Sequence, residues 1–378
     1  SARDFRDSCG FALLAHMDGE KSHWLVRTTL ESLARLTHRG AVAADGKSGD
    51  GCGIMLQFPE PFLRSVAEEC GFRLTERFAS GLVFFSPDDK LIRRGQEIIE
   101  RHLGESALQV TGWREVPTDP CVVGKQALAC MPAIYQVFVN APSGWRPHDI
   151  ERQLFAARRM AFDEQRKLPD PDPLHYVVTL SNLTMVYKGL VQAQHLGDYY
   201  LDLRDERMTS AIGICHQRFS TNTLPRWNYA QPFRYLAHNG EINSVNANRD
   251  WANARAAILR SPLLPRLEEL SHLVNESGSD SSSLDNLLEV FLAGGMDMYR
   301  AMRLVMPPAV REDMDPDLKA FIEFNSMHQE PWDGPAGVVA TNGSVASCNL
   351  DRNGLRPARY SITRDGVFTV ASEAGVWD

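Results

Sequence analysis

The sequence predicts a mixed α+β fold, and three observations support this prediction. Between residues 60 and 182, short apolar runs typical of strands alternate with amphipathic segments typical of helices. Near the carboxyl end, pairs of apolar runs flank Asn342-Gly343 and Asp365-Gly366, and such dipeptides favour hairpin turns between antiparallel strands. The 378 residues are 43% hydrophobic and 23% charged, which is ordinary for a soluble globular protein with a large core.

The charge balance and the apolar runs exclude several classes of function. A formal net charge of −8 argues against nucleic acid and against anionic membranes as partners, because both require a basic face. No apolar run approaches the roughly 20 residues that a membrane helix needs. The first eight residues contain arginines and aspartates without an apolar core, so they are not a secretory signal. We therefore expect a cytoplasmic protein.

Cysteine and histidine spacing gives no sign of a disulfide framework or of a metal site. The 7 cysteines are widely separated and form no C-x-x-C pair, and the 11 histidines include no H-E-x-x-H motif. We expect no metal and no cofactor in this chain.

The amino-terminal elements lead to a glycine-rich stretch. Residues 9–15 have the pattern of a buried strand, and residues 21–36 have the apolar spacing of a helix that stops near Gly40. The stretch 45–53 precedes a strand at residues 54–58. It does not follow a strand, and its spacing differs from that of nucleotide-binding loops. We expect a tight loop that brings backbone close to a site.

The middle of the chain is predicted to contain strands at residues 82–85, 134–139 and 176–180, with helices at residues 90–103 and 148–166. The second helix carries a strongly charged face. The charged residues are Glu151, Arg152, Arg158 and Arg159. We interpret this face as a solvated surface.

Two strands in the second half of the chain end in polar residues. One begins at Ile212 and runs into the polar segment 216–223. The other, within residues 235–242, breaks at Asn239-Gly240. Because residues 243–259 have a helical pattern, we expect a strand-to-helix break rather than a hairpin. Such a break leaves an amide side chain and a glycine N–H facing a ligand.

The carboxyl-terminal third is predicted to hold three more helices and two hairpins. The helices are expected at residues 284–292, 296–304 and 317–327, and the hairpins are expected at 335–350 and 359–371. Serines and Asp280 precede the first of these helices, and helix capping explains such residues as well as ligand binding does.

Several of these residues match the requirements of acyl transfer through a thioester. If the bond before Cys9 is cut, its α-amine, with a pKa of roughly 7.7–8.0, would act as base for its own thiol. Asn239 and the Gly240 N–H would form an oxyanion hole. Arg218 would hold a substrate carboxylate, and Asp280 would accept an ammonium group. The alternative for Cys9 is a buried structural thiol at the start of a strand.

A series of motifs covers nearly all of residues 9–378. They lie at residues 9–11, 38–41, 44–51, 216–223, 230–234, 236–243, 278–281, 330–335 and 351–357. In this order they resemble the amino-terminal glutaminase domain of the bacterial glutamate synthase large subunit, a class II (N-terminal nucleophile) glutamine amidotransferase. Some of these motifs recur across class II amidotransferases, so a member that feeds a different acceptor is one alternative. An inert structural or docking domain is another.

This resemblance implies a fold, an activity and a set of site residues. The fold would be the four-layer αββα sandwich of N-terminal nucleophile hydrolases, with two antiparallel sheets face to face between helices. The activity would be hydrolysis of L-glutamine to glutamate and ammonia. The matched catalytic residues are Cys9, Asn239 and Gly240. The matched substrate-binding residues are Arg39, Arg218, Thr221 and Asp280. Arg39 would lie close to the nucleophile or, alternatively, hold the glycine-rich loop in place.

The resemblance also implies partners. Ammonia would pass to a synthase region that aminates 2-oxoglutarate and that contains FMN and an iron-sulfur cluster, and the small subunit of glutamate synthase would be a further partner. We expect residues 1–8 to be an uncleaved propeptide and residues 9–378 to be an amidotransferase domain truncated at its carboxyl end. With Ser8 attached, the nitrogen of Cys9 is an amide and cannot accept a proton. We therefore expect this form to be inactive or weakly active.

Overall fold

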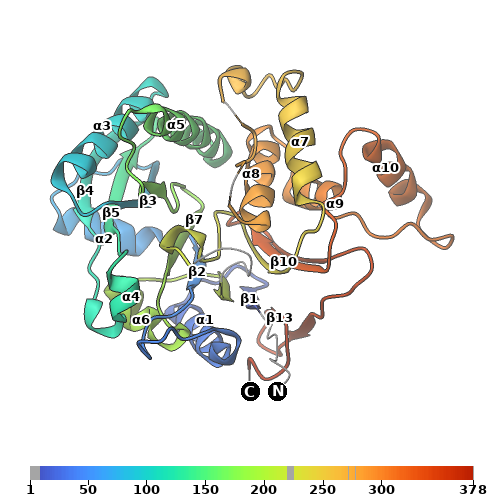
Figure 1. Cartoon of the computed structure of the whole chain (residues 1–378), viewed down its shortest axis with the longest axis horizontal. Coiled ribbons are helices and arrows are strands. Elements are labelled where there is room, and N and C mark those ends of the chain that lie inside the picture. Colours follow the sequence, from blue (N-terminus) through green and yellow to red (C-terminus); the bar gives the residue numbers. More distant parts are fainter. Residues whose placement is uncertain (1–8, 219–224, 271, 277, 378) are drawn as a thin grey trace.

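The computed structural model of the protein describes residues 9–218, 225–270, 272–276 and 278–377. Within these ranges helices and strands are mixed, and the strands form three sheets in which each pair of neighbouring strands is antiparallel. The α+β prediction is therefore confirmed. In Figure 1 strands of two sheets lie near the middle of the molecule, and the strands of the third lie at the left among helices.

The largest sheet joins the two ends of the described chain. Its strands, in spatial order, are β12 (Arg359–Ile362), β13 (Val367–Ala371), β1 (Gly10–His16), β8 (Ile212–Gln217), β2 (Cys52–Gln57) and β7 (Thr184–Gly189). The strand that follows Cys9 is therefore central, with a neighbour on each side. Such a position fixes the backbone at Cys9 more firmly than an edge strand would.

A second sheet packs on the first. It consists of β11 (Ala346–Leu350), β10 (Ala336–Thr341) and β9 (Leu236–Gly240). Because side chains alternate along a strand, its two faces serve two cores. Ala237 and Val339 join the core that contains Phe11 of the large sheet, whereas Leu236 and Val338 join a core formed with the helices of the carboxyl-terminal half.

The third sheet is made by the middle of the chain. Its order is β4 (Gln109–Glu115), β5 (Ala133–Asn140), β3 (Phe78–Phe85) and β6 (Tyr176–Val177). Strand β3 is buried on both faces: Leu82 and Phe84 belong to the main core, and Val83 and Phe85 belong to a separate one. This sheet is therefore packed from both sides.

The helices cover the outside of the sheets. They are α1 (His23–Arg35), α2 (Glu60–Glu69), α3 (Asp89–Glu105), α4 (Lys125–Leu128), α5 (Pro147–Lys167), α6 (Leu196–Tyr199), α7 (Val245–Ala256), α8 (Asp280–Ala293), α9 (Met298–Val305) and α10 (Pro316–Ser326). Figure 1 shows α3 and α5 together on one side and α7 to α10 on the other. In the described ranges, no helix combines the length and the apolar character that crossing a membrane would require.

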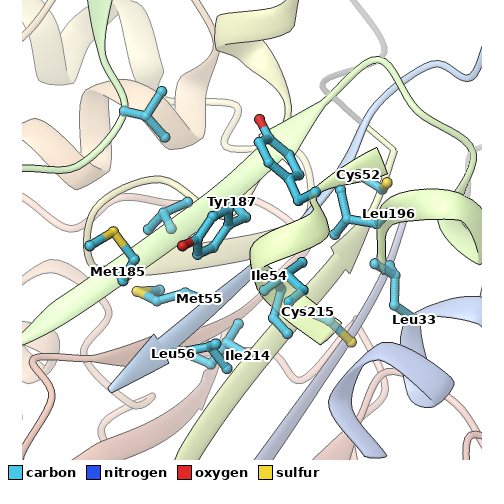
Figure 2. Close-up of a cluster of buried hydrophobic side chains, with 14 of the residues drawn as sticks. Leu33, Cys52, Ile54, Met55, Leu56, Met185, Tyr187, Leu196, Ile214 and Cys215 are labelled. Atoms are coloured by element: carbon cyan, nitrogen blue, oxygen red, sulfur yellow. The ribbon is translucent and has the colours of Figure 1, made fainter. Parts of the chain in front are cut away.

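The main core fills the space beside strands β2, β7 and β8. Figure 2 shows Ile54, Leu56, Tyr187 and Ile214 within one cluster of buried side chains. Burying each such side chain stabilises the fold by about 1.5–3 kcal/mol. Cys215 belongs to the same cluster, and none of the 7 cysteines, all of which are described, forms a disulfide.

Several expected elements are confirmed. The two predicted hairpins correspond to β10–β11 and β12–β13, and β9 ends at Gly240 with helix α7 following. The expected strand at residues 176–180 is shorter, because the N–H groups of Val178 and Thr179 both donate to the Leu82 carbonyl and interrupt the ladder. The sequence pattern did not indicate α2, β4 or β7.

The interpretation of the charged face of residues 148–166 as solvated is wrong. Arg158 is 6% exposed and Arg159 is 9% exposed, because helix α8 packs against this face of α5. Helix α8 supplies the counter-charge: Arg158 Nη2 donates to Glu289 Oε1 at 2.5 Å. Glu151 accepts hydrogen bonds from the Ser181 hydroxyl and from a backbone N–H. Arg158 and Glu151 are therefore bonded to protein groups rather than to water.

Removing one partner of the buried pair should destabilise the protein strongly. Glu289→Ala is expected to lower the free energy of unfolding by about 3–5 kcal/mol, because the guanidinium of Arg158 then stays buried without its counter-charge. Replacing both partners, as Arg158→Met with Glu289→Leu, should cost less than Glu289→Ala alone. Urea denaturation measures both effects, with Arg27→Ala at the exposed Arg27–Glu31 pair as a control that should change little. A double variant less stable than Glu289→Ala would contradict this account.

Candidate functional site

The candidate site lies at one edge of the large sheet, where three strands meet. Gln217, at the end of β8, pairs with Gly10 of β1 and with Cys52 of β2. The next residues along these strands, Cys9 and Arg218, therefore lie at the same edge. Two residues that are more than 200 positions apart in the sequence are brought together by strand register alone.

Cys9 is buried at this edge and has charged neighbours. It is 8% exposed, and burial is the main cause that raises the pKa of its thiol to about 12. Arg218 and Arg356 lower this pKa, whereas Asp50 and Asp280 raise it. Because only the thiolate is a strong nucleophile, a thiol in this environment requires a nearby base.

The second sheet brings Asn239 and Gly240 to Cys9. Asn239 Nδ2 donates to the carbonyl oxygen of Cys9 at 2.9 Å, and Asn239 is 6% exposed. Gly240 has φ +128, and a Cβ at this position would overlap the carbonyl of Pro335, the residue just before β10. Only glycine fits there. The break at these two residues therefore delivers an amide donor to the cysteine.

Arg218 is held by its backbone as well as by its side chain. Its φ is +82, which is uncommon for a residue other than glycine, and its N–H donates to the carbonyl of Gly51 at 2.8 Å. Its Nε lies 3.4 Å from Asp50 Oδ2. Thr221, predicted to bind substrate, lies outside the described residues.

Asp50 is a member of the site to which sequence reasoning gave no role. Its carboxylate, 6% exposed, accepts hydrogen bonds from the Ala41 N–H at 3.0 Å and from Gln217 Nε2 at 3.2 Å. Burial raises its pKa to about 6, although the Ala41 N–H and Arg218 act in the opposite direction. In the sequence, the only indication that Asp50 belongs to the site was its position between two glycines in the predicted loop.

The raised pKa of Asp50 predicts a pH dependence of stability. Since its folded value of about 6 lies above the usual 3.8, the folded chain holds more protons between pH 4 and 6. The Asp50 contribution to stability therefore falls as pH rises through this window. Relative to the parent, Asp50→Asn should gain about 1–3 kcal/mol between pH 4 and pH 7.

Urea denaturation at several pH values measures this gain. Asp149→Asn is a suitable control, because Arg146 and Arg152 lower the pKa of Asp149 by hydrogen bonding. The control should lose stability relative to the parent as pH rises from the acid range. A parent-to-variant difference for Asp50→Asn that stays constant between pH 4 and 7 would contradict the assignment.

Asp280 lies at the start of helix α8, and the helix cap is the preceding residue. Ser279 is the N-cap, and its hydroxyl accepts the Ser282 N–H at 3.1 Å. Asp280 Oδ2 instead accepts the N–H of Ile242 at 2.8 Å, which ties the helix to the segment that follows β9. Its charge also reaches the thiol of Cys9. Asp280 Oδ1 also accepts the N–H of Ser281 at 2.7 Å, so Asp280 bonds both the first turn of the helix and the segment after β9.

Arg39 lies next to the start of β1 but bonds elsewhere. A Cβ added at Gly10 would lie 3.2 Å from Arg39 Cγ. The Arg39 guanidinium hydrogen-bonds Glu373, which also pairs with His38 Nε2 at 2.8 Å. Arg39 thus packs against Gly10, the residue after Cys9, and its guanidinium ties this edge to the segment after β13.

The arrangement provides a buried thiol, an amide donor and charges of both signs at one point. Among the described residues, no group of three or more histidines, cysteines or carboxylates could hold a metal ion. The chemistry available to the side chains of this site is nucleophilic attack by sulfur. The charges beside it suit a substrate that carries both an anionic and a cationic group.

Comparison with known proteins supports the resemblance found in the sequence. Residues 9–378 match a family described as glutamine amidotransferases class-II. The chain is similar to a ferredoxin-dependent glutamate synthase of Pyropia yezoensis, with 39% identity over 98% of the chain and 24% of the relative. Similarity to the glutamate synthase [NADPH] large chain of Bacillus subtilis is 38% over 98% of the chain and 24% of the relative. The chain therefore spans about a quarter of the length of these relatives.

Proposed function

This chain belongs to the class II glutamine amidotransferases, and we infer from this that it performs the glutaminase half-reaction of a glutamate synthase. It would hydrolyse L-glutamine to glutamate and ammonia. The observation that carries this proposal is the convergence of Asn239, Arg218 and Asp280 on Cys9, from two sheets and a helix. These are the residue types that thioester chemistry on an amino acid amide requires.

The proposed reaction begins with the thiol of Cys9. Once Cys9 is the first residue, its α-amine takes the thiol proton, and the sulfur attacks the side-chain amide carbon of glutamine. The Asn239 amide and the Gly240 N–H would stabilise the resulting oxyanion. Ammonia leaves with the transferred proton, and a thioester between Cys9 and the glutamyl group remains. Water then hydrolyses the thioester, which releases glutamate and restores the thiol.

The charged residues would position the substrate. Arg218 would pair with the α-carboxylate of glutamine, and Asp280 would accept its α-ammonium group. Asp50, at 3.4 Å from Arg218, would hold the guanidinium in place before substrate arrives. Thr221 and Arg39 complete the proposed substrate-binding set.

Maturation is part of the proposal. Residues 1–8 would be a propeptide, and residues 9–378 would be the amidotransferase domain. The family match begins at Cys9, which supports this division. The raised pKa of the buried thiol supports a requirement for the terminal amine, because this thiol stays protonated at neutral pH without a base. The uncleaved form would be inactive or weakly active.

The finer fold assignment is also proposed. A four-layer αββα sandwich would place α1, the large sheet, the β9–β11 sheet and helices α8 and α9 in that order. Contacts of α1 with β1 and β8 support the packing of α1 on the large sheet. The division of β9 and β10 side chains between two cores supports a position of the smaller sheet between the large sheet and the carboxyl-terminal helices. The third sheet, with α3 and α5, would be an addition at the side.

The ammonia released would be passed to a synthase region of a longer polypeptide, with the small subunit of glutamate synthase as a further partner. This part of the proposal rests on the relatives, whose names describe glutamate synthases. A class II amidotransferase with a different acceptor would share the hydrolytic step but not the aminated product.

Chemical labelling and turnover test the hydrolytic function. With residues 1–8 removed, a diazo-ketone analogue of glutamine should label Cys9 once per chain, and glutamine should yield glutamate and ammonia in equal amounts. Cys9→Ser should abolish both. Cys70→Ser, at an exposed cysteine, is the matched control and should change neither. Labelling at another residue, or turnover that survives Cys9→Ser, would overturn the proposal and favour a structural or docking domain.

A further inference from the structure

A cavity of about 410 Å³ lies between helices α5 and α8. The segments 171–177, 226–234 and 272–276 complete its walls. Among the described residues, its lining includes none of the side chains assigned above to catalysis or substrate binding. Its volume falls within the range of small-molecule sites. The cavity is therefore a candidate site separate from the one at Cys9.

Two side chains in its lining are buried and without hydrogen-bond partners. Gln165 is 3% exposed, and neither its amide oxygen nor its amide nitrogen makes a hydrogen bond to a described residue. His175 is 9% exposed, and neither of its ring nitrogens makes a hydrogen bond to a described residue. Buried polar groups are almost always bonded, so groups of this kind require an explanation. A ligand with both donor and acceptor atoms would satisfy them.

The charge of the lining is predominantly positive. The arginines of the wall are Arg158, Arg159, Arg166, Arg226 and Arg234, and its carboxylates are Asp163, Asp172 and Glu276. Asp172 accepts hydrogen bonds from the backbone N–H and the hydroxyl of Ser86, and Asp163 pairs with Arg166. Glu276 pairs with His272. The carboxylates of the lining therefore leave part of the arginine charge uncompensated.

Arg159 is the clearest case of a buried cation without a carboxylate in direct contact. It is 9% exposed, and its Nη2 donates to the backbone carbonyl of His272. Within the described part of the chain, no carboxylate oxygen lies within 4.0 Å of a guanidinium nitrogen of Arg159. Burial lowers its pKa only to about 10, so Arg159 remains charged at neutral pH. A buried guanidinium in this state favours an anion beside it.

We propose that this cavity binds a small organic anion, with a carboxylate or phosphate group against Arg159 and polar groups bonded to Gln165 and His175. The planar guanidinium suits the oxygens of either group, and the amide and imidazole recognise a ligand that both donates and accepts. Tyr176 and Tyr229 add aromatic surface to the same wall. The proposal is independent of the glutaminase assignment.

Calorimetric titration of the full chain with two probes tests the proposal. Inorganic phosphate and succinate are titrated separately, and sodium chloride keeps the ionic strength constant. One equivalent of at least one probe should bind, and the tighter probe identifies the anionic group. Arg159→Met should weaken this binding at least tenfold, and Gln165→Leu should weaken it about threefold or more.

Arg146→Met is the matched control, because Arg146 is at the start of the same helix, is exposed and does not line the cavity. It should leave the affinity unchanged. Arg159→Met also removes the hydrogen bond to the His272 carbonyl, so its thermal stability is measured beside its affinity. If Arg159→Met fails to fold, Gln165→Leu decides. Binding of neither probe, or equal weakening by Arg159→Met and Arg146→Met, would overturn the proposal.

Discussion

A chain that begins at Cys9 should hydrolyse glutamine about 10²- to 10⁴-fold faster than the same chain with residues 1–8 attached, which is the range that a positioned general base contributes. The physical reason is the buried thiol, whose pKa is raised to about 12. Few thiolates form at neutral pH without a base, and an amide nitrogen cannot act as one. Cleavage before Cys9 creates an amine with a pKa of roughly 7.7–8.0 at the position where the proton must go.

Initial rates of glutamate release, read beside the intact mass of each preparation, measure this effect. The matched control is the chain that begins at Cys9 with its α-amine acetylated, because it lacks both the leader and the base. This control should remain as slow as the uncleaved chain. Full turnover with Ser8 attached would show that another group removes the thiol proton. Full turnover of the acetylated chain would lead to the same conclusion.

The sequence allowed the candidate site to be assembled because the chemistry of its members is visible in their types. A cysteine before an apolar strand, an Asn-Gly break before a helical pattern and an arginine at a strand end each have structural explanations as well, and the resemblance of the surrounding motifs to a known family favoured the functional one. Asp50 differs from them, since a carboxylate in a glycine-rich loop is common. Its importance follows from bonds to Ala41 and Gln217, which only the folded chain reveals.

The charged face of α5 shows why burial is difficult to predict from one helix alone. The run of arginines and glutamate has the composition of a surface, and it is buried because Glu289 of α8 supplies a counter-charge more than 100 residues later. Strand β7 was missed for a related reason. It contains Lys188, which is fully buried with its Nζ donating to the Asn228 carbonyl at 3.0 Å. In both cases the partner that permits burial is distant in the sequence.

Strand β4 was missed because its pattern is weak. All residues from Gln109 to Glu115 are half-buried or exposed, so the strand lacks the alternation that reveals a buried face. Its place is set by pairing with β5, including a register shift between Val110 and Gly112. Strand pairing of this kind depends on the neighbouring strand rather than on local pattern.

Asn239→Ala should lower kcat for glutamine hydrolysis by about 10²- to 10³-fold while KM changes little, because an oxyanion donor acts mainly in the transition state. The donor is already aimed at this point: Asn239 Nδ2 bonds the carbonyl oxygen of Cys9 at 2.9 Å. In the proposed reaction, the same amide would donate to the substrate oxygen on which charge develops. Steady-state kinetics of the mature chain separate the two parameters.

Asn243→Ala is the matched control, since Asn243 is an exposed asparagine only four residues further along the chain. It should leave kcat and KM unchanged. Gly240 cannot be tested as simply, because a Cβ there overlaps the Pro335 carbonyl and would displace the strand itself. If Asn239→Ala instead raises KM at constant kcat, the amide contributes equally to substrate and transition state. The oxyanion assignment would then be wrong, even if Cys9 remains the nucleophile.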